Sequence, residues 1–360
     1  MSRLLSTTLQ ALRPYVPGEQ PREPIRLKLN TNENPYGPSP KVLAAIQQAT
    51  SEDLRLYPDP TAMKLRQSIA AYYELSPDQV FVGNGSDEVL GHLFQALFQR
   101  PGVVLLPDIS YSFYDTYSAL YDVTPHHIPL DDHLAIQADD YCHYDASPVA
   151  GIIFANPNAP TGLSLTLDDI ARIARAHPDA AVVVDEAYVD FGADSAVALL
   201  GDYDNIVVVQ TLSKSRALAG LRVGFALASP LIVEALTRVK DSFNSYPLDQ
   251  LALVAAQAAM EDTAYFEEIC RRIISDRNEL SRQLAALGFT VLSSDTNFLF
   301  CRPPNGQAQA LAQRLRQHGI LVRHFNHARI QSYLRITVGT SQGCKALCNA
   351  LQQILSSELS

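Results

Sequence analysis

The sequence predicts an α/β fold, in which a large domain with a mainly parallel, doubly wound sheet is followed by a smaller α+β domain. Between residues 80 and 229, short runs of apolar and β-branched residues alternate with loops and helical stretches. This pattern is typical of parallel strands that helices cover on both faces. Three of these runs end in polar side chains at a regular spacing. Beyond residue 229, long helical stretches separated by short strands indicate a second domain of a different type.

The chain is expected to divide into an N-terminal arm (1–28), a large domain (29–245) and a small C-terminal domain (246–360). A length of 360 residues and a hydrophobic content of 47% suit about two domains with sizeable cores. Pro14 and Pro17 make the arm unsuitable for a helix or a central strand. The short apolar run at 25–29 precedes the first helices, and we expect the arm to pack on the small domain as well.

The composition disfavours several classes of function. The net charge is −10 with both signs scattered along the chain, which argues against a nucleic-acid surface. No apolar run approaches the roughly 18 residues that a membrane span needs. The five cysteines are odd in number and form no Cys-x-x-Cys pair, which favours a reduced, cytoplasmic protein. The basic first 18 residues lack the apolar segment and cleavage site of a targeting signal.

Four histidines, His126, His127, His133 and His143, lie in a polar stretch that is expected to form loops. Their spacing matches no metal-ligand pattern, so we expect a solvated face and no metal ion. In a chain of this negative charge, any affinity for anions has to be local and built from a few arginines.

Capping residues, turn residues and apolar patterns indicate where the helices and strands begin and end. A helix over 40–49 is expected to begin after Ser39, and a helix that runs to residue 73 is expected to begin with Thr61 as its cap. Further helices are expected over 86–98 and 168–176, and strands over 80–82, 103–106, 150–155, 181–184, 206–209 and 223–227. The last third is expected to contain helices over 230–240, 248–287 and 342–355, and strands over 291–292, 297–300, 320–322 and 333–338.

A glycine turn joins the strand at 80–82 to the helix that follows it. Gly85, Ser86 and Asp87 stand at the start of that helix, where backbone N–H groups point outward and can bind an anion. The glycine patterns of dinucleotide sites and of ATP-binding P-loops do not occur here, so neither ligand is favoured. The turn by itself is also compatible with an ordinary strand–helix connection.

Three successive strands end in Asn156, Asp185 and Lys214. Both gaps are 29 residues, from 156 to 185 and from 185 to 214, which is about one strand–helix unit. Ligands in such sheets bind at the carboxyl ends of the strands, so we expect these side chains to meet there. Singly, Asn156 could form a turn and Asp185 could cap a helix.

Lys214 follows a run of four buried strand residues, 206–209. Burial disfavours the charged form of an amine, and the neutral amine is the form that makes a Schiff base. Arg222 lies eight residues further on, close enough to add positive charge and to hold a phosphate. Lys214 is therefore a candidate catalytic residue.

Together these residues match the needs of pyridoxal 5′-phosphate. This cofactor takes a lysine for the Schiff base, a carboxylate at the ring nitrogen, donors to the ring oxygen and a phosphate site. Lys214 is the candidate for the Schiff base and Asp185 the candidate for the ring nitrogen. Asn156 and Tyr188 are the candidate donors to the ring oxygen, and Ser213, Arg222 and residues 85–87 are the candidates for the phosphate site. Lys214 would also move a proton between the substrate carbon and the cofactor. Tyr111 is expected to stack on the ring, with a core aromatic as the alternative.

The chain resembles the fold-type I PLP-dependent aminotransferases over nearly its whole length, and among them the histidinol-phosphate aminotransferases. The resemblance is carried by a set of motifs in a fixed order. They are Pro14-Tyr15-Val16-Pro17-Gly18, Asn32-Glu33-Asn34-Pro35-Tyr36-Gly37-Pro38-Ser39, Tyr57-Pro58-Asp59, Gly85-Ser86-Asp87-Glu88, Asn156-Pro157-Asn158-Ala159-Pro160-Thr161-Gly162, Asp185-Glu186-Ala187-Tyr188, Ser213-Lys214, Ala219-Gly220-Leu221-Arg222-Val223-Gly224 and Leu334-Arg335-Ile336-Thr337-Val338-Gly339-Thr340.

The resemblance implies a cytoplasmic homodimer that transaminates histidinol phosphate with 2-oxoglutarate in histidine biosynthesis. It implies that Tyr57 reaches the cofactor phosphate of the partner subunit. Arg335 would bind the carboxylate of glutamate or 2-oxoglutarate. With Arg323, Tyr15 and Asn32, it would also hold the phosphate of histidinol phosphate. A guanidinium suits both groups, so one site can serve both half-reactions. For Arg323, a surface arginine is the alternative.

The chain departs from the family pattern at two places. Arg216 and Ala217 stand where many members carry a phenylalanine–glycine pair, which points to a branch with a different specificity. Ser86 stands where alanine is also common, and it should be tolerated because backbone N–H groups do most of the binding.

Three other functions remain open on this scaffold. One is a PLP lyase acting on an amino-acid phosphate, such as threonine-phosphate decarboxylase, and another is an aromatic or broad-range aminotransferase. The third is a non-catalytic regulator, which the complete catalytic set and the lack of an appended helix-turn-helix domain disfavour.

Overall fold

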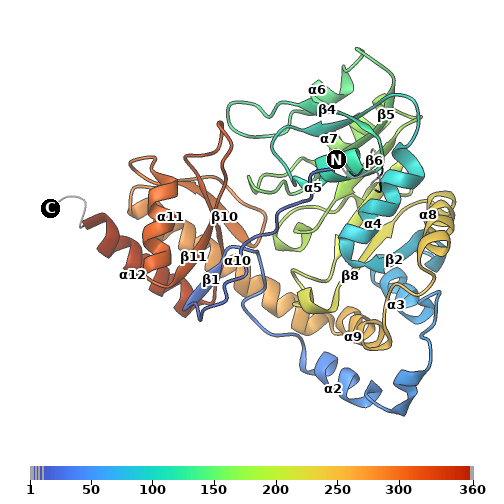
Figure 1. The fold of residues 1–360 in the computed structure, drawn as a ribbon, viewed down its shortest axis with the longest axis horizontal. Coiled ribbons are helices and arrows are strands. Elements are labelled where there is room, and N and C mark those ends of the chain that lie inside the picture. Colours follow the sequence, from blue (N-terminus) through green and yellow to red (C-terminus); the bar gives the residue numbers. More distant parts are fainter. Residues whose placement is uncertain (1–3, 5, 7–8, 10–11, 357–360) are drawn as a thin grey trace.

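In the computed structural model, which describes residues 4, 6, 9 and 12–356, the chain is built around two sheets (Figure 1). The larger sheet has the strand order β2-β8-β7-β6-β5-β3-β4. Its strands are β2 (Val80–Asn84), β3 (Val103–Pro107), β4 (Thr124–Ile128), β5 (Val149–Ala155), β6 (Ala181–Asp185), β7 (Ile206–Thr211) and β8 (Val223–Leu227). Strand β8 runs in the direction opposite to the other strands of this sheet. The prediction of a mainly parallel sheet is therefore confirmed.

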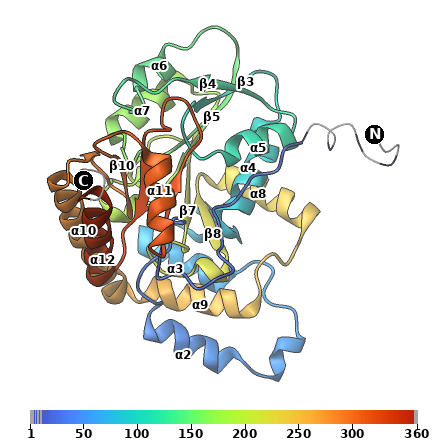
Figure 2. The ribbon, with the colours of Figure 1, turned by 60° about the vertical axis from the view of Figure 1, so that its left-hand side comes forward.

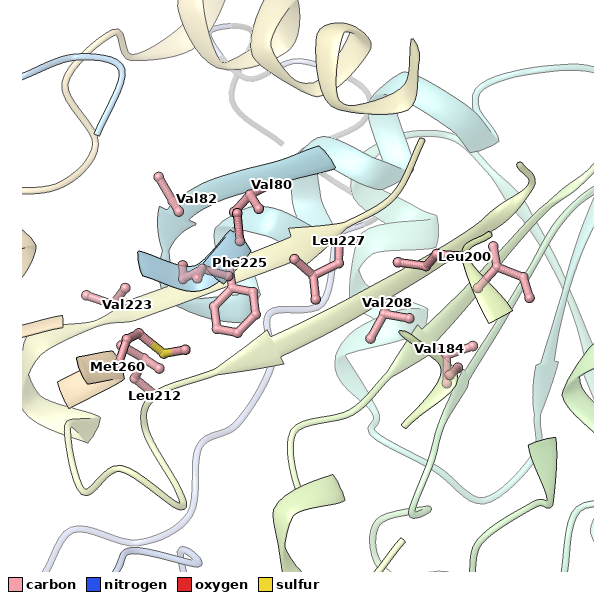
Figure 3. Close-up of a cluster of buried hydrophobic side chains, with 14 of the residues drawn as sticks. Val80, Val82, Val184, Leu200, Val208, Leu212, Val223, Phe225, Leu227 and Met260 are labelled. Atoms are coloured by element: carbon pink, nitrogen blue, oxygen red, sulfur yellow. The ribbon is translucent and has the colours of Figure 1, made fainter. Parts of the chain in front are cut away.

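Both faces of the larger sheet are buried, because successive strand residues point to opposite sides. In β7, Ile206 and Val208 pack in one core, and Val207 and Val209 pack in the other. All four side chains are 0% exposed, and burying each stabilises the fold by about 1.5–3 kcal/mol. Figure 3 shows part of the first core, where Val208 and Phe225 project from adjacent strands.

Helices cover each face of the larger sheet. The first core takes side chains from α2 (Pro40–Ala49), α3 (Met63–Tyr73), α6 (Ala138–Cys142), α7 (Leu167–Ala176) and α9 (Gln250–Glu261). The second takes side chains from α4 (Gly85–Leu93), α5 (Phe113–Leu120) and α8 (Pro230–Phe243). Short helical turns occupy Glu52–Arg55, Pro77–Gln79, Phe94–Phe98, Val189–Phe191, Ala196–Leu199 and Ala219–Leu221.

Helix α7 illustrates why the sequence forms these elements. Ile170, Ile173 and Ala174 recur at intervals of three and four residues and are buried on one face. The Thr166 side chain accepts a hydrogen bond from the backbone N–H of Asp169, so it caps the helix at its N-terminus. The apolar stripe then docks on the sheet while the charged face stays in water.

The smaller sheet joins the N-terminal arm to the C-terminal part of the chain. Its strand order is β1-β11-β12-β10-β9, with bounds β1 (Leu27–Leu29), β9 (Thr290–Val291), β10 (Phe298–Arg302), β11 (Ile320–His324) and β12 (Leu334–Thr337). Helices α10 (Thr263–Ala286), α11 (Ala308–Gln317) and α12 (Ser341–Ser356) complete its core. In Figure 1, the blue strand β1 lies among the orange and red elements. β1 pairs with β11 in parallel, which confirms that the arm packs on the smaller sheet.

The single helical stretch expected over 248–287 is wrong. Helix α9 ends at Glu261 and α10 begins at Thr263, with Asp262 between them. The Asp262 carboxylate accepts hydrogen bonds from the Ser39 hydroxyl and from the Lys41 ammonium, so the break is tied to the start of α2. Helix α9 lies beside α2 at the bottom of Figures 1 and 2, whereas α10 contacts the smaller sheet. The expected domain boundaries stay a prediction.

Two local expectations are also wrong. Thr61 does not cap α3, because the Asp59 carboxylate accepts hydrogen bonds from the backbone N–H groups of Thr61 and Met63, both at 2.9 Å. His126 and His127 do not lie in a loop, since they belong to β4 at the edge of the larger sheet. An edge strand with one buried residue carries no apolar run for the sequence to reveal.

Within the ranges that the structure describes, no helix has the length and hydropathy to cross a membrane. The same residues contain no group of three or more His, Cys, Asp or Glu side chains arranged to hold a metal ion. All five cysteines lie in the described part of the chain and are free thiols.

Candidate active site

A cavity of about 450 Å³ lies at the carboxyl edge of β6 and β7, and its walls come from both sheets. Asp185 ends β6 and Lys214 follows β7, whereas Arg323 and Arg335 belong to β11 and β12. Most of the predicted site residues line this cavity, namely Tyr15, Asn32, Ser86, Asp87, Tyr111, Asp185, Tyr188, Ser213, Lys214, Arg222, Arg323 and Arg335. The structure therefore brings them together, and their individual roles stay predictions.

Asp185 is a buried carboxylate at the floor of the cavity, with 4% of its surface exposed. The Tyr114 hydroxyl donates to Oδ2 at 2.8 Å, and the backbone N–H of Ala187 donates to Oδ1 at 3.3 Å. Burial raises the pKa of Asp185 to about 6, although the hydrogen bond from Tyr114 acts in the opposite direction. A cation placed beside this carboxylate would favour its ionised form, as a protonated ring nitrogen does.

A backbone cradle lies where β2 meets α4. Gly85 has a φ of +76°, and a Cβ atom there would lie 2.5 Å from Arg222 Nη2. On the adjacent strand, a Cβ atom on Gly224 would lie 2.3 Å from the backbone nitrogen of Ser86. Only glycine fits at both positions. The start of α4 thus presents its free N–H groups beside a guanidinium, which suits a phosphate.

Arg222 is fixed in place from several sides. Its backbone is in the left-handed region with a φ of +54°. Its Nη2 donates to Asp87 Oδ2 at 2.9 Å, and its Nη1 lies 3.5 Å from Ser213 Oγ. Asp87 also accepts a hydrogen bond from the Tyr111 hydroxyl at 3.0 Å. Because this ion pair is well exposed to solvent, it adds little stability, and its main effect is to orient the guanidinium.

The Lys214 amine enters the cavity between two residues that are distant in the sequence. Its Nζ lies 3.4 Å from the carbonyl oxygen of Thr31 and 5.8 Å from the centroid of the Tyr188 ring. The Asn34 side-chain amide donates to the carbonyls of Lys214 at 2.9 Å and Ser215 at 3.1 Å. The backbone of the lysine turn is therefore held from outside the turn, while the side chain stays directed at the cavity.

Arg216 and Ala217, which depart from the family pattern, lie beside the lysine turn and outside the cavity lining, whereas Ser86 lines the cavity. The Ser215 hydroxyl donates to the Asp190 carboxylate. The Arg216 guanidinium is 3.9 Å from the centroid of the Phe266 ring, a cation–π contact in a buried setting. Ala217 has a φ of +58°, a conformation that favours glycine. The two residues therefore belong to the support of the lysine turn and not to the lining of the cavity.

Three predicted residues do not line the cavity. Gly85 lies beneath Arg222 as part of the cradle. Asn156 is 1% exposed, and its Oδ1 accepts a hydrogen bond from the backbone N–H of Leu165 at 2.7 Å. Tyr57 is 82% exposed and stacks on Tyr246 with the ring centroids 4.7 Å apart. Tyr57 thus does not reach the cavity of its own chain, and its contact with a partner subunit stays a prediction.

Arg323 and Arg335 lie close together on the opposite wall. Arg335 Nη2 donates to the carbonyl of Asn30 at 2.9 Å, while its buried Nε has no hydrogen-bond partner among the described residues. Burial lowers the pKa of Arg335, and the nearby charge of Arg323 lowers it further. Both guanidinium carbons lie 5.5 Å from the centroid of the Phe325 ring. These two guanidinium groups are half-buried, and the buried Nε of Arg335 has no partner among the described residues. Together they favour a carboxylate or a phosphate between them.

The N-terminal arm reaches the site through Tyr15. Its ring lies 5.8 Å from the centroid of Tyr111 and 4.8 Å from that of Phe113. Burial raises the pKa of Tyr15, although Arg323 and Arg335 act in the opposite direction. The phenol therefore remains a hydrogen-bond donor beside the two arginines.

The sequence reading missed Tyr114 and Asn34 as functional residues. Tyr114 is 0% exposed and binds Asp185, and its only signal was its place in the Tyr111, Tyr114, Tyr117 series at helical spacing. Asn34 holds the lysine turn from 180 positions away. The sequence shows that Asn34 lies in a loop rich in side-chain amides, but it does not show that Asn34 bonds to the backbone of Lys214.

Behind the site, the carboxylate of Glu186 is buried and forms no salt bridge with any residue that the structure describes. It accepts hydrogen bonds from Ser195 Oγ at 2.7 Å, Gln210 Nε2 at 2.8 Å and the backbone N–H of Ala196 at 2.6 Å. Burial raises the pKa of Glu186 to about 7, since these bonds offset only part of the desolvation, and the nearby charge of Asp190 adds to the rise.

Glu186 should make the stability of the protein depend on pH. Because its folded pKa lies above its unfolded value of 4.5, the folded state binds the extra proton, and stability falls as pH rises from about 4.5 to 7. We expect Glu186→Gln to raise the free energy of unfolding at pH 8 by about 1–3 kcal/mol relative to the wild type. Urea unfolding at pH 5 and pH 8 checks this, with the exposed Glu267→Gln as control. An equal increase in the free energy of unfolding at both pH values would contradict the prediction.

The fold and the cavity define an aminotransferase of classes I and II. The model of that family, aminotransferase class I and II, matches residues 24–351, and the chain belongs to this family. The aminotransferase activity expected from the sequence is thereby confirmed.

More specifically, the chain is similar to histidinol-phosphate aminotransferases. It is 56% identical over 357 residues to histidinol-phosphate aminotransferase 1 of Bordetella parapertussis, covering 99% of this chain and 100% of the relative. It is 54% identical over 351 residues to histidinol-phosphate aminotransferase of Pseudomonas putida, covering 98% of this chain and 100% of the relative. The solved structure of histidinol-phosphate aminotransferase from Sinorhizobium meliloti in complex with pyridoxal 5′-phosphate matches with a TM-score of 0.89, 25% identity and 99% coverage of both chains. The resemblance stated from the sequence is confirmed.

Proposed function

We propose that this chain transfers the amino group of histidinol phosphate to 2-oxoglutarate, with pyridoxal 5′-phosphate as cofactor, giving imidazole-acetol phosphate and glutamate. The observation that carries the proposal is the pair of half-buried guanidinium groups of Arg323 and Arg335, which line the same cavity as Lys214. The full-length relatives at 54–56% identity are histidinol-phosphate aminotransferases, which favours this substrate within the family.

The residues around the cavity fit the cofactor, because each of its polar groups finds a matching partner. The phosphate would be held by the N–H groups at the start of α4 with Ser213 and Arg222, the ring nitrogen by Asp185, and the ring oxygen by Tyr188, with Tyr111 on the ring face. Asn156, predicted to share the ring oxygen, lies outside the cavity lining and bonds to the backbone of Leu165. When bound, pyridoxal 5′-phosphate withdraws electrons from the carbon that carries the substrate amine. The amine of Lys214, directed into the cavity, would take the proton from the substrate carbon that carries the amine and would return it during the transfer.

A shared anion site explains how one cavity serves two half-reactions. Histidinol phosphate ends in a phosphate ester and glutamate ends in a carboxylate, and a guanidinium binds both groups through paired N–H donors. The buried Nε of Arg335 has no partner among residues 12–356 and is available for this purpose, and Arg323 lies close enough to share the charge. The substrate's other end then lies toward the Lys214 amine.

The Arg335→Ala variant should therefore bind both substrates poorly. Loss of a charged hydrogen bond of about 1.5–3 kcal/mol predicts a rise in KM of roughly 10- to 100-fold for histidinol phosphate and for 2-oxoglutarate alike. Steady-state kinetics with each substrate varied in turn provides the measurement. Arg302→Ala, an exposed arginine at the end of β10, is the matched control. If KM rose for one substrate alone, the shared site would be refuted.

We also propose that the protein is a cytoplasmic homodimer, in which Tyr57 contacts the cofactor phosphate of the partner subunit. Large aromatic side chains that face solvent support an interface on this side. Phe243 is 78% exposed and Tyr246 is 42% exposed, and the Tyr246 ring stacks on Tyr57. Sedimentation velocity of the loaded protein tests the dimer, and a monomer at micromolar concentration would rule it out.

A donor screen distinguishes the proposed activity from its alternatives. Turnover of histidinol phosphate should depend on added 2-oxoglutarate and should release no CO₂. Release of CO₂ from an amino-acid phosphate without 2-oxoglutarate would point to a lyase instead. Turnover of phenylalanine at a comparable kcat/KM would point to an aromatic or broad-range aminotransferase.

A further inference from the structure

Every polar atom of Asn32, which the sequence assigned to substrate binding, already makes a hydrogen bond to the protein. Its backbone N–H donates to Thr337 Oγ1 at 3.0 Å, and its Oδ1 accepts from the same hydroxyl at 3.0 Å. Its carbonyl accepts from Asn297 Nδ2 at 3.0 Å, and its Nδ2 donates to the Tyr188 hydroxyl at 2.9 Å. Asn32 is 1% exposed, and Thr337 and Asn297 are also buried. No acceptor or donor of the side chain is left entirely free for a substrate.

The backbone of Asn32 is held in an unfavourable conformation. Its φ is +56°, in the left-handed region, where non-glycine residues are uncommon. Such strain persists where several contacts fix the residue, and it gathers at functional sites. Here the contacts come from β12 and from the segment before β10, so the smaller sheet sets the position of Asn32.

The Tyr188 side chain is fixed at both ends by this arrangement. Its ring packs edge-on against Phe298 with centroids 5.1 Å apart, and its hydroxyl oxygen accepts the Asn32 amide hydrogen. Because the oxygen accepts from Asn32, the Tyr188 proton is free to be donated in another direction. Other polar groups around the phenol are Lys214, Arg335 and Tyr15, which face it from the cavity.

We propose that Asn32 is a positioning residue that fixes the Tyr188 phenol as a donor to the ring oxygen of the cofactor. Through Thr337, it ties this donor to β12, the strand that also carries Arg335 two residues earlier. Arg335 contacts the same segment, because its Nη2 donates to the carbonyl of Asn30. The segment 30–32 thus links the substrate's anion site to the cofactor's hydrogen bond. The inference rests on the proposed binding of pyridoxal 5′-phosphate in this cavity.

The test is a pH titration of the absorbance of the bound cofactor, without substrate. A donor to the ring oxygen stabilises its anionic form, so removing the donor should move the spectral midpoint to higher pH. For Tyr188→Phe we expect a rise of about one pH unit, which corresponds to one hydrogen bond to a charged group. Asn32→Gly should move the midpoint in the same direction without backbone strain, and Asn32→Asp should do so because the phenol would then donate to the new carboxylate.

The double variant and a neighbour complete the experiment. Asn32→Gly in the Tyr188→Phe background should add no further shift, since both act through one hydrogen bond. Asn30→Gly is the matched control, because the Asn30 side chain is equally buried and donates to the carbonyl of Glu19. The Asn30→Gly variant should have the same spectral midpoint as the wild type. Circular dichroism checks folding, and Asn32→Asp carries the test if Asn32→Gly does not fold.

The outcomes separate this inference from the proposed function. A wild-type protein that takes up no pyridoxal 5′-phosphate overturns the proposed function. A wild-type protein that loads, with a shift in Tyr188→Phe and none in either Asn32 variant, overturns the positioning role alone. Equal shifts in Asn30→Gly and Asn32→Gly would also overturn it, because they would indicate a general loosening of the segment.

Discussion

Replacement of Lys214 by alanine is expected to remove essentially all transamination, with kcat falling by about 10⁴-fold or more. In the proposed function Lys214 would supply both the covalent attachment of the cofactor and the base that moves the substrate proton, and proton transfer alone is worth about 10²–10⁴-fold. The purified wild type should be yellow from bound cofactor, and Lys214→Ala should lose that Schiff-base absorbance. Single-turnover kinetics and absorbance spectra give the two measurements.

The control for this variant is Lys345→Ala, which removes an exposed lysine on α12. It should keep both colour and activity. Partial recovery of Lys214→Ala by added methylamine would show that the missing group is an amine and that the cavity is otherwise intact. Borohydride reduction should attach a pyridoxyl group to Lys214 in the wild type. Attachment at another lysine would contradict the assignment.

The Asp185→Asn variant is expected to keep its fold and to lose about 10²- to 10³-fold in kcat. An amide cannot hold a positive charge on the ring nitrogen, so the cofactor becomes a weaker electron acceptor. The Tyr114 hydroxyl can still donate to the amide oxygen, as it donates to Oδ2 at 2.8 Å in the wild type. The loss should therefore lie in the chemical step and not in stability.

Kinetics and unfolding together check the Asp185 variant. The kcat of each half-reaction should fall while the KM values change little, and the urea midpoint should equal or exceed that of the wild type, because a desolvated carboxylate has been removed. Asp202→Asn, at an exposed position before β7, is the control and should change neither. A variant with normal kcat would mean that Asp185 does not face the ring nitrogen.

Much of the large sheet and the floor of the site could be predicted, because both follow from local patterns. Apolar runs such as 206–209 identify buried strands, and the residue after each run lies at the same edge of a parallel sheet. Asp185 and Lys214 were placed in one cavity on that basis, and the structure brings them there. The glycine turn before α4 was visible for the same reason, since Gly85 needs a backbone that other residues avoid.

Errors arose where a neighbour outside the local pattern decides the outcome. The helical pattern of 248–287 continues through Asp262, and the break there is bound by Ser39 and Lys41 of α2. Strand β4, with His126 and His127, forms because β3 offers a free edge, although its own residues carry little apolar signal.

By itself, the sequence determined which strand ends carry the lysine, the carboxylate and the glycine turn, since periodicity and turn chemistry act over a few residues. Only the tertiary structure decided how those groups are held. Thr337 and Asn32 are 305 positions apart, and Asn34 and Lys214 are 180 apart, yet both pairs are hydrogen-bonded. Such contacts depend on how the two sheets dock, and that docking is set by the packing of whole surfaces, which no short stretch of residues encodes.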